Sequence, residues 1–160
     1  MRRHLIAGLG GFASLAVLAG CASQQGPKPP PIINFGWFYA QTPGEGAKLV
    51  YGQEGTDNVT LMLICRPRSG HVEVTLSGDK AGAVQLMSGR LSARLLVRPP
   101  DGEGMESMLI GDLRADSPVL AAFVRDGDLT ILDGARRTPL PMRPTERRLA
   151  ADFVTACRPA

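Results

Sequence analysis

The strongest constraint on the fold is a period-two alternation of apolar and polar residues in short segments. Between 71 and 77 every second residue is apolar, namely Val72, Val74 and Leu76. Such alternation is typical of a strand with one buried face. Residues 58–65 are apolar on both faces, which predicts a central strand covered on both sides. The turn-forming residues 66–70 separate these two segments, so we expect them to pair as an antiparallel hairpin.

Helix signals follow in the second half of the chain. Ser117 and Pro118 predict the start of a helix over 118–126, and Gly127 suits its left-handed end. Thr145 is expected to cap a last helix over about 146–157. The predicted fold class is therefore α+β, an antiparallel sheet of about six to eight strands with a short helix and a C-terminal helix packed on it. The other strands are expected at 33–40, 48–51, 83–87, 90–98, 105–110 and 129–132.

The N-terminal residues have the organisation of an export signal. Arg2 and Arg3 precede an apolar stretch over 5–18 that is shorter than the about 20 residues of a membrane span. Leu18-Ala19-Gly20-Cys21 then resembles the lipobox of bacterial lipoproteins, which signal peptidase II cuts before the cysteine. The resemblance implies that residues 1–20 are removed, that Cys21 is acylated, and that membrane lipid is a partner through that group.

The residue after the cysteine is Ala22. An Asp at this position tends to retain lipoproteins of enteric bacteria in the inner membrane, so Ala22 resembles the sorting signal of an outer-membrane lipoprotein. The expected location is thus the outer membrane, on its periplasmic face or at the cell surface. Residues 21–31 contain four prolines and predict an extended tether, at about 3.1 Å per residue. Residues 32–160 are expected to form one globular domain.

Charge argues against nucleic acid as a partner. The full chain has 18 Lys and Arg against 15 Asp and Glu, and loss of Arg2 and Arg3 with the signal leaves 16 against 15. A nearly neutral domain lacks the electrostatic attraction that nucleic-acid binding requires.

The two cysteines beyond Cys21 are Cys65 and Cys157. An even pair in an exported protein predicts a disulfide, with two buried free thiols as the alternative. Cys157 continues the i, i+4, i+8 stripe of Leu149 and Phe153, and Cys65 ends the central strand. The pairing would fasten the last helix to the sheet.

Two groups of residues are candidates for binding. Phe35, Trp37 and Tyr39 share one strand face opposite Phe38, and they form either an exposed platform for a sugar, peptide or protein, or part of the core. A C-terminal arginine group faces either anionic lipid headgroups or an acidic partner, or is simply a solvated surface. It comprises Arg136, Arg137, Arg143, Arg147, Arg148 and Arg158, against Glu146 and Asp152.

Catalytic signals are sparse. His71 is the single histidine beyond the signal, and with Glu73 and Asp79 it could form an acid–base pair or a weak metal site. The alternative is an exposed histidine on the polar face of a strand. No cofactor motif or metal-ligand spacing occurs.

The function expected from these patterns is a membrane-anchored envelope lipoprotein that is not an enzyme. It would be a binding or accessory factor for a secreted or outer-membrane enzyme or for transport machinery, with an envelope protein as partner. A structural or stress-related envelope protein is one alternative, and a hydrolase that uses His71 with a nearby carboxylate is another.

Overall fold

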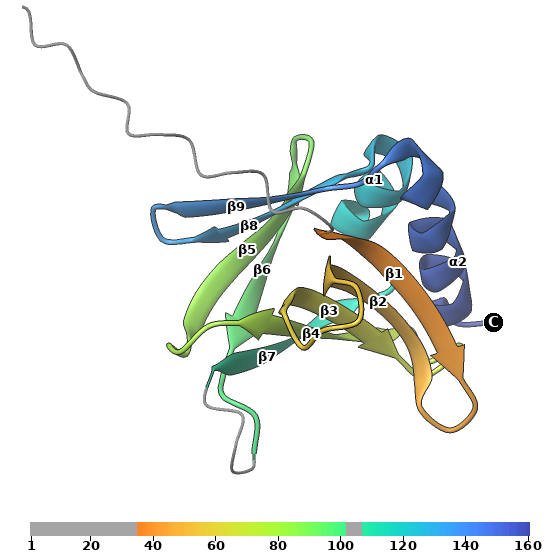
Figure 1. The fold of residues 1–160 in the computed structure, drawn as a ribbon, viewed down its shortest axis with the longest axis horizontal. Coiled ribbons are helices and arrows are strands. Elements are labelled where there is room, and N and C mark those ends of the chain that lie inside the picture. Colours follow the sequence, from red (N-terminus) through yellow and green to blue (C-terminus); the bar gives the residue numbers. More distant parts are fainter. Residues whose placement is uncertain (1–34, 102–106) are drawn as a thin grey trace, which may run out of the picture. The chain divides into compact units, whose positions relative to one another are not determined.

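A computed structural model describes residues 35–101 and 107–160. They form an α+β domain, as predicted, with antiparallel sheets and two helices (Figure 1). The predicted signal sequence, Cys21 and the tether lie outside the described residues. The strands are β1 (Phe35–Thr42), β2 (Gly46–Gln53), β3 (Val59–Cys65), β4 (His71–Ser77), β5 (Gly82–Ser88), β6 (Leu91–Val97), β7 (Met108–Arg114), β8 (Asp128–Asp133) and β9 (Arg136–Pro141).

The nine strands of the described residues exceed the predicted six to eight, and they form two sheets instead of one. The first sheet has the order β1-β2-β3-β4-β7 and the second the order β6-β5-β8-β9. Arg98, just beyond β6, pairs with Ile110 of β7 through backbone hydrogen bonds of 2.9 and 2.7 Å. The two sheets are therefore joined at this one bridge, and their outer strands are β1 and β7 in the first sheet and β6 and β9 in the second.

The helices cover the inner faces of the sheets. Helix α1 (Pro118–Asp126) packs against β5 and β6, and α2 (Arg147–Cys157) packs against β1 and β2. The largest buried side chains are Trp37, Phe123 and Phe153. Full burial of one large apolar side chain contributes roughly 1.5–3 kcal/mol, so each of these contacts between helices and sheets is a substantial part of the stability of the domain.

Strand β3 is central in its sheet, but only one of its faces is covered. Leu61, Leu63 and Cys65 are buried, whereas Met62 and Ile64 are only half-buried. The prediction of a strand covered on both sides was wrong because both helices lie on the inner face. Strand β4 alternates as predicted, with its apolar residues on that inner face.

The start of the last helix also differs from the prediction. A 3-10 turn, Pro144–Glu146, precedes α2, and Arg143 occupies the N-cap position of that turn. Thr145 lies inside the turn and does not cap the helix. The proline at the first position of the turn favours this start, because its missing N–H would have no partner there.

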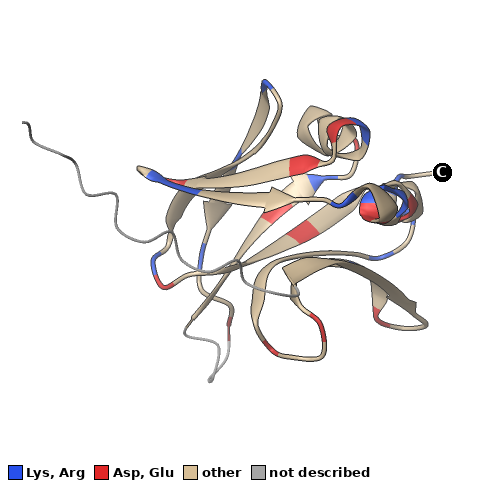
Figure 2. Ribbon diagram, turned by 45° about the horizontal axis from the view of Figure 1, so that its top comes forward, with Lys and Arg blue, Asp and Glu red and all other residues tan. Residues whose placement is uncertain are grey.

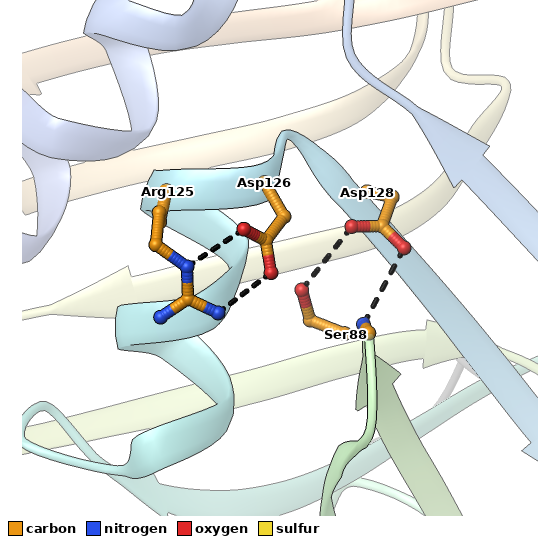
Figure 3. A network of polar contacts seen from close by, with 5 residues as sticks. Ser88, Arg125, Asp126 and Asp128 are labelled. Carbon is orange, nitrogen blue, oxygen red and sulfur yellow. Dashed lines mark hydrogen bonds and ion pairs between the residues drawn. The ribbon is translucent and has the colours of Figure 1, made fainter.

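Helix α1 begins and ends where the sequence predicts. Ser117 is at its N-cap position without a side-chain hydrogen bond, and Gly127 adopts a φ of 74° and donates its N–H to the Phe123 carbonyl. Beyond the helix, the Asp128 carboxylate accepts hydrogen bonds of 3.4 Å from the Ser88 hydroxyl and the Gly89 N–H (Figure 3). These bonds join the β5–β6 turn to the start of β8.

The predicted disulfide between Cys65 and Cys157 is confirmed, with the two Cα atoms 5.7 Å apart. The loop after β3 supports the same junction. Arg68 donates its backbone N–H to the Ala156 carbonyl at 2.8 Å, and Gly70 donates to the Cys157 carbonyl at 2.9 Å. Two of the carbonyls that every helix end leaves free are thus satisfied by this loop.

Candidate functional site: a cleft between the two sheets

A cleft of about 410 Å³ opens between the two sheets, beside the first residue of β1. Its volume lies at the lower end of the range of small-molecule sites. Both sheets contribute its apolar lining, which includes Phe35, Leu76, Val84, Leu109 and Ile131. Four of these side chains are buried and Phe35 is half-buried, so the cleft has an apolar floor that belongs to the core.

Charged residues of both signs surround this floor. Asp79 and Lys80 follow β4, and Asp133 and Arg136 face each other across the β8–β9 hairpin. All four are exposed, and none forms an ion pair with another described residue. The rim therefore offers two carboxylates and two cations to a ligand without first breaking an internal bond.

At the free edge of β1, one backbone N–H, that of Trp37, is bound by Glu146, a residue that is only 5% exposed. Its Oε1 accepts hydrogen bonds from the Trp37 N–H at 3.3 Å and from Nε of Arg143 at 2.5 Å, and its Oε2 accepts from the Arg143 N–H at 2.8 Å. Gly36 allows this close approach, because a Cβ there would lie 2.7 Å from Oε1 of Glu146 and closer still to Nη2 of Arg143, so that both side chains would have to move. The hydrogen bond between the side chains of Arg143 and Glu146 also raises the pKa of Arg143.

From the sequence, Glu146 was expected only as an acidic residue among the C-terminal arginines, and its role at β1 was not predicted. The signal was present as an acidic residue three positions after Arg143 with Pro144 between them, which is the spacing of a capping box. What the spacing does not reveal is that the same carboxylate reaches strand β1.

The aromatic group of β1 is divided between core and surface. Trp37 is 1% exposed, with its ring centroid 5.2 Å from that of Tyr51 and 4.8 Å from that of Phe123. It therefore belongs to the core, and the interpretation of Trp37 as an exposed binding residue is wrong. Burial is also the main reason that the pKa of Tyr51 is raised, and the Glu146 carboxylate adds to the shift.

Tyr39 lies farther along the same strand and is half-buried. Its hydroxyl donates a 2.8 Å hydrogen bond to Gln41, and with Asp152 it lines a shallow groove between β1 and α2. Desolvation, and then the charge of Asp152, raises the pKa of Tyr39. Tyr39 is thus separated from the cleft, whereas Phe35 lines it.

The arginine group does not form one basic patch, as Figure 2 shows by the spread of basic residues over separate elements. Arg136 lies at the cleft rim, and Arg143 is bound to Glu146. Arg148 lies 3.5 Å from Asp152. Arg147 acts on Asp126 at the end of α1: the hydrogen bond from Arg125 lowers the pKa of this carboxylate, and the charge of Arg147 lowers it further. Apart from these, Arg137 is exposed on β9 beside Arg136, and Arg158 is exposed at the end of α2.

His71 and Glu73 share one face of β4 and line the same shallow pocket, but the other predicted partner, Asp79, does not join them. Nε2 of His71 lies 2.8 Å from a carboxylate oxygen of Asp112 on β7, and both side chains are exposed. Glu73 faces Asp112 across the strand pair, but Asp79 lies beyond the opposite end of β4, a strand that is itself about 20 Å long. The histidine therefore has a different carboxylate partner from the one predicted, on an open sheet face.

Among the described residues, no group of three His, Cys, Asp or Glu side chains is placed to hold a metal ion. In the same part of the chain no helix has the length and apolar character needed to cross a membrane. In comparisons with known proteins, no family model, no curated protein and no solved structure matches this chain.

Proposed function

We propose that the chain is a lipid-anchored envelope protein that acts by binding, with the cleft between the sheets as its ligand site. It would serve an envelope enzyme or transport machine as an accessory factor. The observation that carries the proposal is the combination, in one cleft, of an apolar floor with exposed charges of both signs at its rim. Ligand sites of proteins typically have this composition.

The anchor is argued from Leu18-Ala19-Gly20-Cys21 and the apolar stretch before it. Two lipid signals already give stable membrane attachment, so acylation of Cys21 together with its N-terminus would fix the domain to a bilayer. Phe35, the first residue of β1, lines the cleft. A binding protein attached to a bilayer is suited to cargo that comes from the membrane.

The anchor is tested by Cys21→Ser in the full chain expressed in bacteria. We expect the variant to lose lipid labelling and either to leave the membrane fraction or to accumulate with its signal attached. A second variant, Ala22→Asp, keeps the cysteine and is expected to move the protein from outer-membrane to inner-membrane fractions in enteric bacteria. If Cys21→Ser is labelled and fractionates like the parent, the anchor is refuted.

The ligand role is tested separately by crosslinking the native lipoprotein in its own envelope and identifying what is recovered. Recovery of a defined ligand or partner that Arg136→Glu reduces and Arg137→Glu does not would support the cleft. The two arginines are neighbours on β9, but only Arg136 lines the cleft. Equal recovery with both variants would contradict the proposal.

A further inference from the structure

We propose that the cleft binds a single-chain amphiphile with a zwitterionic headgroup, such as a lysophospholipid that carries a phosphate and an ammonium group. The acyl chain would lie between the sheets and the headgroup at the rim. This inference rests on the proposed binding function and names its ligand class. A cleft of about 410 Å³ has room for one such chain segment.

An extended peptide is the main competing ligand for an apolar cleft between two sheets, because it can add a strand to a free edge. Both edges beside this cleft disfavour that mode. On β9, Pro139 and Pro141 have no N–H to donate. On β1, the Trp37 N–H is already bound to Glu146. A ligand that binds by apolar burial and charge needs neither edge.

The rim charges select the headgroup. Lys80 and Arg136 provide cations for a phosphate, and Asp79 and Asp133 provide carboxylates for an ammonium group. A fatty acid carboxylate would gain from the cations but would be repelled by the two acids. A zwitterion can satisfy both signs at once, so this rim favours it over a singly charged amphiphile.

The source of the amphiphile follows from the position of the cleft. The predicted tether over 21–31 would hold the domain within about 30 Å of the bilayer, at about 3.1 Å per residue. Monomers that leave the membrane surface would meet the cleft at that distance. The lipids of the bilayer itself carry two chains and should enter the cleft poorly.

The experiment uses the intact lipoprotein in nanodiscs and lysophosphatidylethanolamine with a photoreactive group at the end of its acyl chain. After irradiation, peptide mapping by mass spectrometry should place the adducts on residues of the cleft floor, around Leu76, Val84 and Leu109. Unlabelled lysophosphatidylethanolamine should compete better than a fatty acid of equal chain length. Adducts spread over the surface, or equal competition by the fatty acid, would overturn the inference.

The charge of Arg136 supplies the matched variant. Arg136→Glu should weaken competition about five-fold, which corresponds to the upper end of an exposed charge interaction, whereas Arg137→Glu should leave it unchanged. A photoreactive two-chain phosphatidylethanolamine in the nanodisc should give no adduct on the cleft floor, and labelling there would contradict the single-chain specificity.

The outcomes separate this inference from the proposed function. If lysophosphatidylethanolamine fails to label the cleft but a partner or ligand is still lost from the envelope with Arg136→Glu, the ligand class is wrong and the binding role stands. If neither is found, both are wrong. Because both arginines are exposed, neither variant removes a buried contact, and circular dichroism can verify that the two variants are folded.

Discussion

The buried Glu146 carboxylate connects two parts of the chain that are distant in sequence, strand β1 and the turn before α2. It joins the turn before α2 to the edge of β1 through the Trp37 N–H, and it neutralises the charge of Arg143. A buried acid is costly unless it is paired and hydrogen-bonded, and here it is both. Loss of the carboxylate would leave a buried N–H without a partner, which costs more than the bond itself contributes.

We therefore expect Glu146→Ala to lower the free energy of unfolding by about 2–4 kcal/mol, because the backbone N–H groups of Trp37 and Arg143 would lose their acceptor. Urea unfolding with the disulfide intact measures this. Asp152→Ala is the control on the same helix, because it removes an exposed ion pair with Arg148 and should cost less than about 1 kcal/mol. Equal losses of unfolding free energy in the two variants would show that the hydrogen bonds of Glu146 contribute no more to stability than an exposed ion pair.

At the scale of elements, α2 is fixed at both ends, by Glu146 next to its start and by the Cys65–Cys157 disulfide at its end. The cysteines are 92 residues apart in the sequence, so the bridge closes most of the domain into one loop. A crosslink over a loop of this length removes much of the conformational entropy of the unfolded chain.

The double variant Cys65→Ala, Cys157→Ala should unfold at lower urea concentration, with a loss of about 2–5 kcal/mol. Dithiothreitol should lower the stability of the parent by a similar amount and leave the double variant unchanged. In the double variant, the rate of amide hydrogen exchange should increase most in α2 and in the loop after β3 that binds the end of this helix. A loss below about 1 kcal/mol would mean that packing alone holds the helix.

Elements with strong local signals were predictable from sequence, and those that depend on tertiary partners were not. The bounds of α1 follow from Pro118 and Gly127, and the alternation of β4 identifies its buried face. The open outer face of β3 was not predictable, because Met62 and Ile64 are as apolar as a covered face would require. The cleft could not be found either, because its lining residues are distant in sequence and none belongs to a motif.

At the scale of the whole molecule, one core unites the two sheets and the two helices, and Trp37 lies inside it. Trp37 contacts Phe123 of α1 and Tyr51 of β2, so its environment depends on both helices and sheets being assembled. As the single tryptophan of the chain, it reports on the global fold.

Its fluorescence in the folded protein should be blue-shifted and nearly inaccessible to acrylamide, since the side chain is 1% exposed. Unfolding in urea should shift the emission to longer wavelength in the same transition that circular dichroism detects, as expected for a two-state domain. Quenching of the urea-unfolded chain by acrylamide gives the reference value for a fully accessible tryptophan. Emission like that of tryptophan in water before any urea is added would contradict the burial of Trp37.

The blocked donors on the outer strands β1 and β9 affect how neighbouring copies of the domain can associate. Proteins held on a surface meet one another at high local concentration, where unpaired edges of neighbouring copies tend to join into extended sheets and fibres. Here Pro139 and Pro141 on one edge, and the Trp37–Glu146 bond on the other, remove donors that such joining requires. The loss of these donors disfavours edge-to-edge pairing of neighbouring copies at these positions.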